Sequence, residues 1–202
     1  MKSRRSILVD VFIALFLCLV AGQTQTAGKT PPPAPYPELT ALVQKQFGKT
    51  FTLPAGFPTP LITADFDGDG VEDVVIVTNS AEPIPDSMEF KYQVIDPYNA
   101  YFGMSDPSIT TAFGTSDPKR NHLLVVIFGA GTEAWHASVP KAKFVIVNLP
   151  FDTISIGRML IKKNKPPIFV IKAHEAQVMD STVYWDAKRK RWKWEPGDPP
   201  RG

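Results

Sequence analysis

Cysteine is almost absent from this chain of 202 residues, which contains a single one, Cys18, near its N-terminus. A lone thiol cannot form an internal disulfide, so the fold has to be stabilised by its core or by a bound metal. Histidine is scarce as well, because only His122, His136 and His174 are present and they lie far apart. Zinc sites need histidine or cysteine at short, regular spacings, and the sequence offers neither an H-E-x-x-H motif nor a cysteine pair.

The motifs of common reaction centres are also missing. There is no G-x-S-x-G nucleophile elbow. The glycine-rich segment GAGTEAWH, residues 129–136, leads into a predicted strand, whereas a phosphate-binding loop needs a helix that begins at its glycines. We interpret this segment as a turn with a packed Trp135, and we expect the protein not to be an enzyme. A hydrolase that uses His136 with Glu133 is a third hypothesis.

The N-terminus has the features of a secretory signal peptide. Three basic residues among the first five precede an apolar stretch from Ile7 to Gly22, which is interrupted by Asp10 and followed by the polar sequence QTQT. A membrane-spanning helix needs on the order of 20 apolar residues. We therefore expect a cleaved signal peptide over residues 1–28 and an exported protein, periplasmic or secreted, with no stable membrane span after cleavage. A retained anchor is the alternative.

Charge gives no indication of a polyanionic partner. The formal net charge of +2 belongs to the signal segment, because cleavage after residue 28 removes three basic residues and one acidic residue. The remainder is formally neutral, so we expect no nucleic-acid partner.

A proline-rich linker and one globular domain follow the predicted signal. Residues 29–36, KTPPPAPY, carry no apolar period and are interpreted as an extended linker. Residues 37–202 are enough for one domain. It begins with PELTALVQKQF, whose apolar residues recur at the spacing of one helix face, and Gly48 follows as a natural stop.

Beyond this helix, apolar residues alternate with period 2 or form short runs, which predicts strands. The strand candidates are LITADF, DVVIVT, HLLVVIFG, AKFVIVNL, PPIFVIKA, STVYWD and RWKWE. We therefore predict a mainly β protein, of the α+β kind, with an antiparallel sheet and one N-terminal amphipathic helix. Residues 79–121 are weakly periodic and are interpreted as a long insertion or loop that covers the sheet. The sequence DTISIGRMLIKK, residues 152–163, is compatible with a helix or a strand.

Alternating aspartates form the most specific motif of the chain. In DFDGDGVED, Asp65, Asp67, Asp69 and Asp73 occupy positions 1, 3, 5 and 9 of a loop, with the carbonyl of Val71 available at position 7. Ca²⁺ accepts about 6 to 8 oxygen ligands in flexible geometry, and the two intervening glycines allow the backbone to curl around an ion. Position 12 is isoleucine and the flanks favour strands, which excludes an EF-hand. The alternative is a solvated acidic turn without a metal.

This loop resembles the calcium loop of FG-GAP and VCBS repeats, the blades of integrin-type propellers, in which D-x-D-G-D-G-x-x-D joins two strands. The match covers Asp65, Asp67, Gly68, Asp69, Gly70 and Asp73. The resemblance implies that Ca²⁺ is coordinated by Asp65, Asp67, Asp69, Val71 and Asp73. A propeller needs several blades, and the sequence has no second copy of the loop. The chain looks more like small exported bacterial proteins with one such loop in a compact sheet and a YYWDGK-like terminal hairpin, here VYWDAKRKRWKW.

The C-terminal hairpin mixes aromatic and basic residues. TVYWD and RWKWE alternate with period 2 around AKRK, which predicts that Trp192 and Trp194 share one face and that Arg191 and Lys193 share the other. Our leading hypothesis is an exported, non-enzymatic calcium-binding protein. The alternative is a module that binds an envelope component, a glycan or an anionic surface through Trp135 or through the terminal hairpin with Trp192 and Trp194.

Overall fold

Helix α2, Pro37–Phe47, opens the described part of the chain. The computed structural model describes residues 36–114 and 120–197, so the predicted signal peptide and nearly all of the predicted linker lie outside the described residues. Proline at the start of the helix and Glu38 in its first turn suit a helix N-terminus. Gly48 follows with a φ of 109°, a conformation that glycine adopts without strain. The predicted helix is confirmed.

Nine strands and several short helices follow in the described residues. The strands are β1 Leu61–Ala64, β2 Asp73–Thr78, β3 Gln93–Ile95, β4 Leu123–Phe128, β5 Ala142–Ile146, β6 Thr153–Met159, β7 Ile168–Glu175, β8 Met179–Asp186 and β9 Arg191–Pro196. The further helices are α3 Ser87–Phe90, α4 Pro97–Tyr101, α5 Pro107–Gly114 and the 3-10 helix η2 Gly131–His136. Every strand candidate is confirmed, and the ambiguous segment 152–163 contains β6. Residues 79–121, interpreted as a long insertion or loop, are not an unstructured loop, because they contain α3, β3, α4 and α5.

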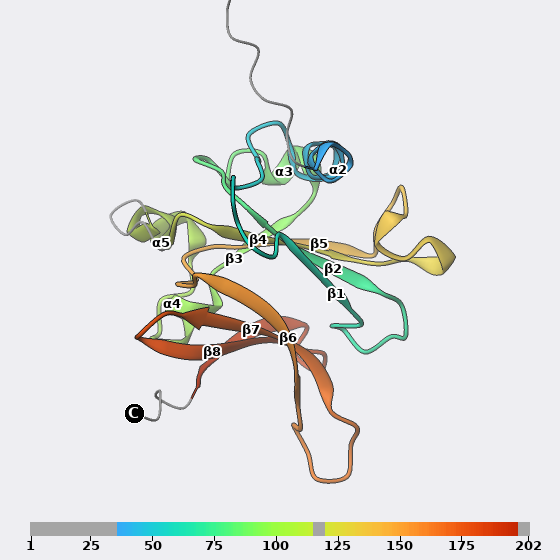
Figure 1. Ribbon diagram of the computed structural model, residues 1–202, viewed down its shortest axis with the longest axis vertical. Coiled ribbons are helices and arrows are strands. Elements are labelled where there is room, and N and C mark those ends of the chain that lie inside the picture. The colour runs from blue at the N-terminus through green and yellow to red at the C-terminus, as the bar shows by residue number, and fades with distance from the viewer. Residues whose placement is uncertain (1–35, 115–119, 198–202) are drawn as a thin grey trace, which may run out of the picture. The chain divides into compact units, whose positions relative to one another are not determined.

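The strands form two sheets (Figure 1). The first has five strands in the order β1-β2-β4-β5-β3, with β3 parallel to β5 and the other pairs antiparallel. The second has four antiparallel strands in the order β6-β7-β8-β9. The prediction of a mainly β, largely antiparallel protein is confirmed. The sequence pattern did not predict that the strands divide into two sheets.

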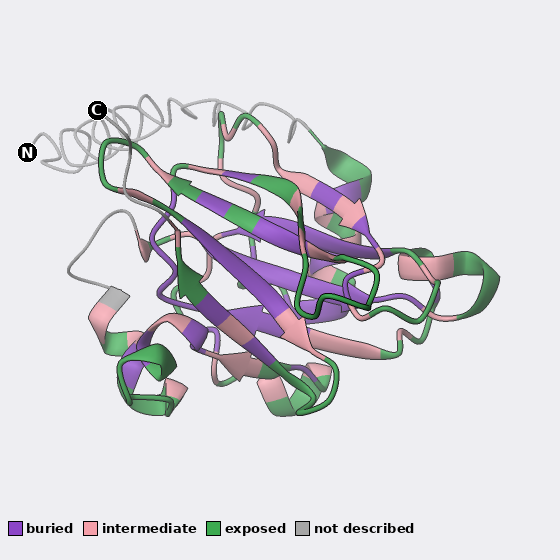
Figure 2. Cartoon of the chain, turned by 90° about the horizontal axis from the view of Figure 1, so that it is seen from below, coloured by how far each residue is buried: buried purple, intermediate pink, exposed green. Residues whose placement is uncertain are grey.

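The five-stranded sheet lies between α2 and the four-stranded sheet (Figure 1), so both of its faces are covered. This explains why the central strands β2 and β4 are buried at every residue and are apolar except for Asp73 and Thr78 at the two ends of β2. On the face toward α2, sheet residues that include Val74, Ile76, Val125 and Ile127 form a core cluster with Val43 and Phe47 of the helix. The face toward the second sheet packs through Val75, Val77, Leu124, Val126, Phe144, Ile171 and Val183, among others. Figure 2 shows this burial along the central strands.

The C-terminal hairpin closes the second sheet. Its register sets Trp185 opposite Trp192 and places Trp194 on the same face as Trp192, in the core between the sheets. Arg191 is exposed and Lys193 is half-buried, so the predicted division of the hairpin into an aromatic and a basic face is confirmed.

The described residues belong to one compact unit that spans residues 34–202. Within the described part of the chain, the helices are too short or too polar to cross a membrane.

Candidate metal centre

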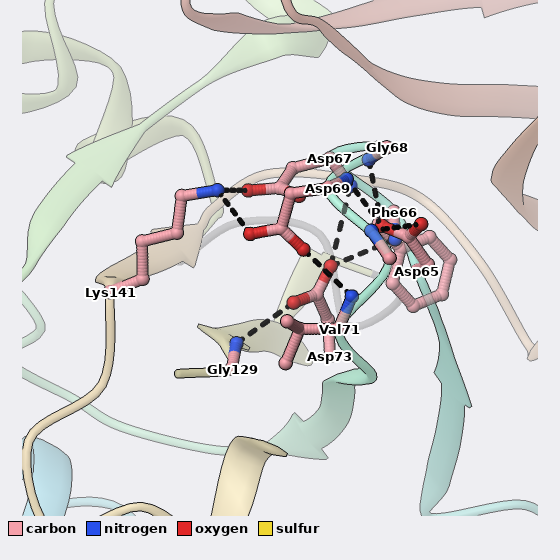
Figure 3. Close-up of polar contacts among 10 residues, drawn as sticks. Asp65, Phe66, Asp67, Gly68, Asp69, Val71, Asp73, Gly129 and Lys141 are labelled. Carbon is pink, nitrogen blue, oxygen red and sulfur yellow. Dashed lines mark hydrogen bonds and ion pairs between the residues drawn. The ribbon is translucent and has the colours of Figure 1, made fainter. Parts of the chain in front are cut away.

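The aspartate loop connects β1 to β2 at one end of the five-stranded sheet (Figure 3). The antiparallel ladder sets Ala64 opposite Asp73, which closes the base of the loop. Between them, Gly68 and Gly70 have φ values of 80° and 87°. Because L side chains rarely adopt such values, the two glycines allow the loop to turn back toward the start of β2.

Three of the five predicted ligands converge. One carboxylate oxygen from each of Asp65, Asp67 and Asp73 lies within 4.8 Å of the others. Two carboxylates about 5 Å apart repel by roughly 1 kcal/mol in water and by nearer 3 kcal/mol at a partly buried site. A cation among them would remove this repulsion, and hard oxygen ligands suit Ca²⁺ or Mg²⁺. This acidic cluster could therefore hold a metal ion.

Asp69 and Val71 have different positions in the loop. Asp69 lies outside the converging group: its Oδ1 accepts the N–H of Val71 at 2.8 Å, and its Oδ2 accepts a bond from Lys141 at 2.5 Å. The bond from Lys141 is the largest influence on Asp69 and lowers its pKa. Asp69 is thus a charged partner of a lysine, and Val71 contributes its N–H to the turn.

Lys141 adds a cation to the site that the sequence motif does not contain. Its Nζ lies 2.6 Å from Asp67 Oδ2 and 2.5 Å from Asp69 Oδ2, and it reaches them from just before β5 (Figure 3). The Asp67 side chain is only 4% exposed, whereas that of Lys141 is 46% exposed, so the ammonium group covers the loop from the solvent side. Its hydrogen bonds to both aspartates raise the pKa of Lys141, which keeps it charged at neutral pH.

Asp73 is a buried clamp between the loop and the sheet. Its Oδ2 accepts the N–H of Phe66 at 2.8 Å and that of Asp67 at 3.3 Å, and its Oδ1 accepts the N–H of Gly129 at 2.8 Å. Asp73 is 1% exposed. Burial raises its pKa to about 7, although the N–H donors act in the opposite direction. A nearby cation would favour the ionised form of this carboxyl group.

The segment GAGTEAWH extends from this clamp. A Cβ at Gly129 would lie 2.3 Å from the carbonyl oxygen of Glu72, so this position requires glycine. The predicted turn takes the form of η2, Gly131–His136, in which two short 3-10 segments meet at a non-helical Ala134 with φ 52° and ψ −132°. The expected packing of Trp135 is confirmed: it is half-buried against the core, its Nε1 donates to Glu72 Oε2 at 2.9 Å, and its ring stacks on His136 with centroids 3.5 Å apart.

The hairpin tryptophans lie in the core, in a different group of side chains from the aspartates. Trp192 and Trp194 are 6% and 3% exposed. Trp192 packs against Phe128, and Trp194 packs against Tyr98 and Tyr101. Both line a cleft at the edge of β9, whereas Trp135 belongs to the cluster on the opposite face of the five-stranded sheet. The three tryptophans therefore do not form one binding surface.

Comparisons with known proteins give no match: no family model, no curated protein and no solved structure matches the chain. The resemblance to FG-GAP and VCBS loops therefore rests on the motif residues alone. Function has to be inferred from the geometry and chemistry of the site.

Proposed function

We propose that this protein is an exported, non-enzymatic protein that binds Ca²⁺ through the loop from Asp65 to Asp73, and that the ion stabilises the fold. The observation that carries the proposal is the convergence of oxygens from Asp65, Asp67 and Asp73 within 4.8 Å. Asp67 and Asp73 are almost inaccessible to solvent. Buried carboxylates need a compensating charge, and one lysine provides a single positive charge for four aspartates.

A structural role for the ion follows from what the loop connects. Asp73 holds the N–H of Phe66 in the loop and the N–H of Gly129 at the end of β4. A cation beside Asp73 would fix the start of β2 relative to these neighbours. The predicted signal peptide implies that the protein is exported. Calcium-binding modules outside the cell have Kd values of about 0.1 to 1 mM. We expect an affinity in that range.

Lys141 would compete with the ion. Its ammonium group already occupies Asp67 Oδ2 and Asp69 Oδ2. Because Ca²⁺ and the ammonium group repel each other and would both bind the carboxylate of Asp67, calcium binding should release Lys141 from Asp67. The lysine would then act as a counter-ion that keeps the calcium-free loop closed.

Calcium should raise the melting temperature of the wild-type protein. At about ten times its Kd, a ligand that binds only the folded state stabilises it by about 1.4 kcal/mol, which corresponds to a Tm rise of about 3 to 6 °C for a domain of this size. Asp67→Ala should abolish the rise, because it removes one converging carboxylate. Lys141→Gln should enlarge it at subsaturating calcium, because it removes the competing cation. The measurement is a calcium titration followed by differential scanning calorimetry.

The control for this titration is Glu89→Ala, which removes a carboxylate from the exposed surface of α3, outside the loop. Its calcium response should equal that of the wild type. The proposal is wrong if calcium leaves the Tm unchanged in both the wild type and Asp67→Ala.

Calcium affinity should depend on pH through Asp73. Burial raises the pKa of this carboxyl from 3.8 to about 7 in the folded chain. In the absence of calcium, Asp73 therefore contributes stability that is fully present below about pH 4 and is lost as the pH rises through about 7. Calcium favours the ionised carboxylate, so its affinity should fall as the pH decreases below about 7, and binding there should release a proton.

Calorimetric calcium titrations at about pH 5.5 and about pH 8 test this dependence, and buffers with different ionisation enthalpies report the proton. The opposite finding would be equal affinity at both pH values, with no proton released.

A further inference from the structure

A cleft of about 420 Å³ opens between the edges of the two sheets. One wall is β3, the edge strand of the five-stranded sheet, and the other is β9, the edge strand of the four-stranded sheet. The lining also includes residues of α4 and the segment that follows it, Phe144 of β5, Trp185 of β8 and Lys190 in the turn before β9. The volume falls within the range of about 300 to 1,000 Å³ that is typical of small-ligand pockets.

Aromatic side chains line much of this cleft. They are Tyr101, Phe144, Trp185, Trp192 and Trp194. The ring of Tyr101 lies 5.1 Å from that of Trp194 at an angle of 75°, and Tyr101 is 54% exposed. The cleft therefore offers both a buried aromatic floor and a ring that is accessible from solvent.

Two hydrogen-bond donors in the lining lack an acceptor. The indole N–H groups of Trp192 and Trp194 are buried and have no hydrogen-bond partner among the described residues. Buried polar groups are nearly always paired, and exceptions often mark functional sites. Both nitrogens have almost no solvent-accessible surface, so a ligand in the cleft would contact the aromatic rings and not these N–H groups.

The rim of the cleft carries an excess of positive charge. Lys190, Arg191 and Lys193 belong to the lining, and the side chains of Lys190 and Arg191 form no ion pair with any described residue. The lining also contains Asp96, which accepts bonds from two asparagine amides, and Glu195, which accepts one from a tyrosine hydroxyl. These neutral donors leave both negative charges in place, so three basic and two acidic residues give the lining a formal excess of one positive charge. An anionic group on a ligand would complement this rim.

We propose that this cleft binds an acidic sugar, that is, a hydroxylated ring that carries a carboxylate. The apolar face of the ring would pack on the aromatic floor, and the carboxylate would pair with Lys190 and Arg191. Hydroxyl groups would bond to polar residues of the lining, which include Gln93 and Ser105. An aromatic acid would leave these polar groups unmatched, and a bare anion would leave the aromatic floor exposed. No residue of the aspartate loop lines the cleft, so this inference does not rest on the calcium proposal.

Binding should be measured by titration calorimetry and tryptophan fluorescence with oligosaccharides of two or three glucuronate, galacturonate or mannuronate units. Their neutral counterparts, phenylacetate and inorganic phosphate are the comparison probes. At least one acidic oligosaccharide should bind with a Kd below about 1 mM, and its neutral counterpart should bind about tenfold more weakly or worse. The proposal fails if none of the three acidic series binds at about 10 mM, if the neutral sugars bind equally well, or if phenylacetate or phosphate binds as tightly.

Variants of the rim separate a specific site from general charge attraction. Lys190→Gln and Arg191→Gln alter exposed side chains and should each weaken binding by about tenfold with an unchanged Tm. Tyr101→Ala should weaken it by a similar factor through loss of the ring surface. The matched control is Lys188→Gln, which lies in the same turn, is exposed, and does not line the cleft. Equal losses in Lys188→Gln and Arg191→Gln would overturn the proposed site.

Discussion

Asp73→Ala should lower the free energy of unfolding by about 3 to 5 kcal/mol in the absence of calcium, and by more when calcium is present, because the variant also loses the stabilisation by the ion. The carboxylate accepts N–H bonds from Phe66, Asp67 and Gly129, and Asp73 is 1% exposed. A buried donor that loses its acceptor costs about 1 to 3 kcal/mol. Partial entry of water into the space left by the side chain should keep the total below the sum of three such losses. Urea unfolding in the presence of a chelator measures this effect without any contribution from the ion.

Two further variants distinguish the structural role of Asp73 from its role as a metal ligand. Asp73→Asn keeps the shape, but its NH₂ group has to face the N–H of either Phe66 or Gly129, so it should also destabilise the protein. Asp65→Ala is the contrasting case, because Asp65 accepts the N–H groups of three loop residues that are exposed to solvent. It should abolish the calcium response at a cost of only about 1 kcal/mol in the chelated protein. Equal costs for Asp65→Ala and Asp73→Ala would contradict the clamp.

The sequence predicted those residues of the site that lie close together in the chain. Asp65, Asp67 and Asp73 could be identified because a short loop between two paired strands has to bring alternate side chains near one another. Lys141 lies 74 positions from Asp67, and its contact depends on how β5 pairs with β4. No spacing within the loop contains that information. The same holds for Gly129, whose need to be glycine arises from the nearby carbonyl of Glu72.

The same holds for the fold: the sequence predicted individual strands but not how distant strands pair. Apolar runs such as VVIV and LLVVIF predict strands because continuous burial requires cover on both faces, and the structure provides that cover with α2 on one side and the second sheet on the other. The strands did not indicate which sheet each would join. β3 was missed because it has three residues, half-buried or exposed, and its register is set by parallel pairing with β5 rather than by its own pattern.

Trp192→Ala should lower the free energy of unfolding by about 3 to 5 kcal/mol, the usual cost of truncating a large aromatic side chain in a core. Trp192 is 6% exposed and its ring packs with those of Phe128, Phe144 and Trp185. These rings come from both sheets, so the cavity would open at the interface between them. Thermal and urea unfolding measure the loss. Its size would also make Trp192→Ala a poor test of ligand binding, because loss of binding could not be separated from loss of structure.

Trp192→Phe is the informative partner of this variant. Phenylalanine fills less of the space, but it also removes the buried indole N–H that has no acceptor among the described residues. These effects oppose each other, so we expect a cost below about 1.5 kcal/mol. Trp135→Ala, at a half-buried position on the other face of the five-stranded sheet, should cost less than Trp192→Ala. If Trp192→Ala cost no more than Trp135→Ala, the hairpin tryptophan would not contribute to the interface between the sheets. It would then belong to a surface, as the hypothesis of a tryptophan-rich binding hairpin requires.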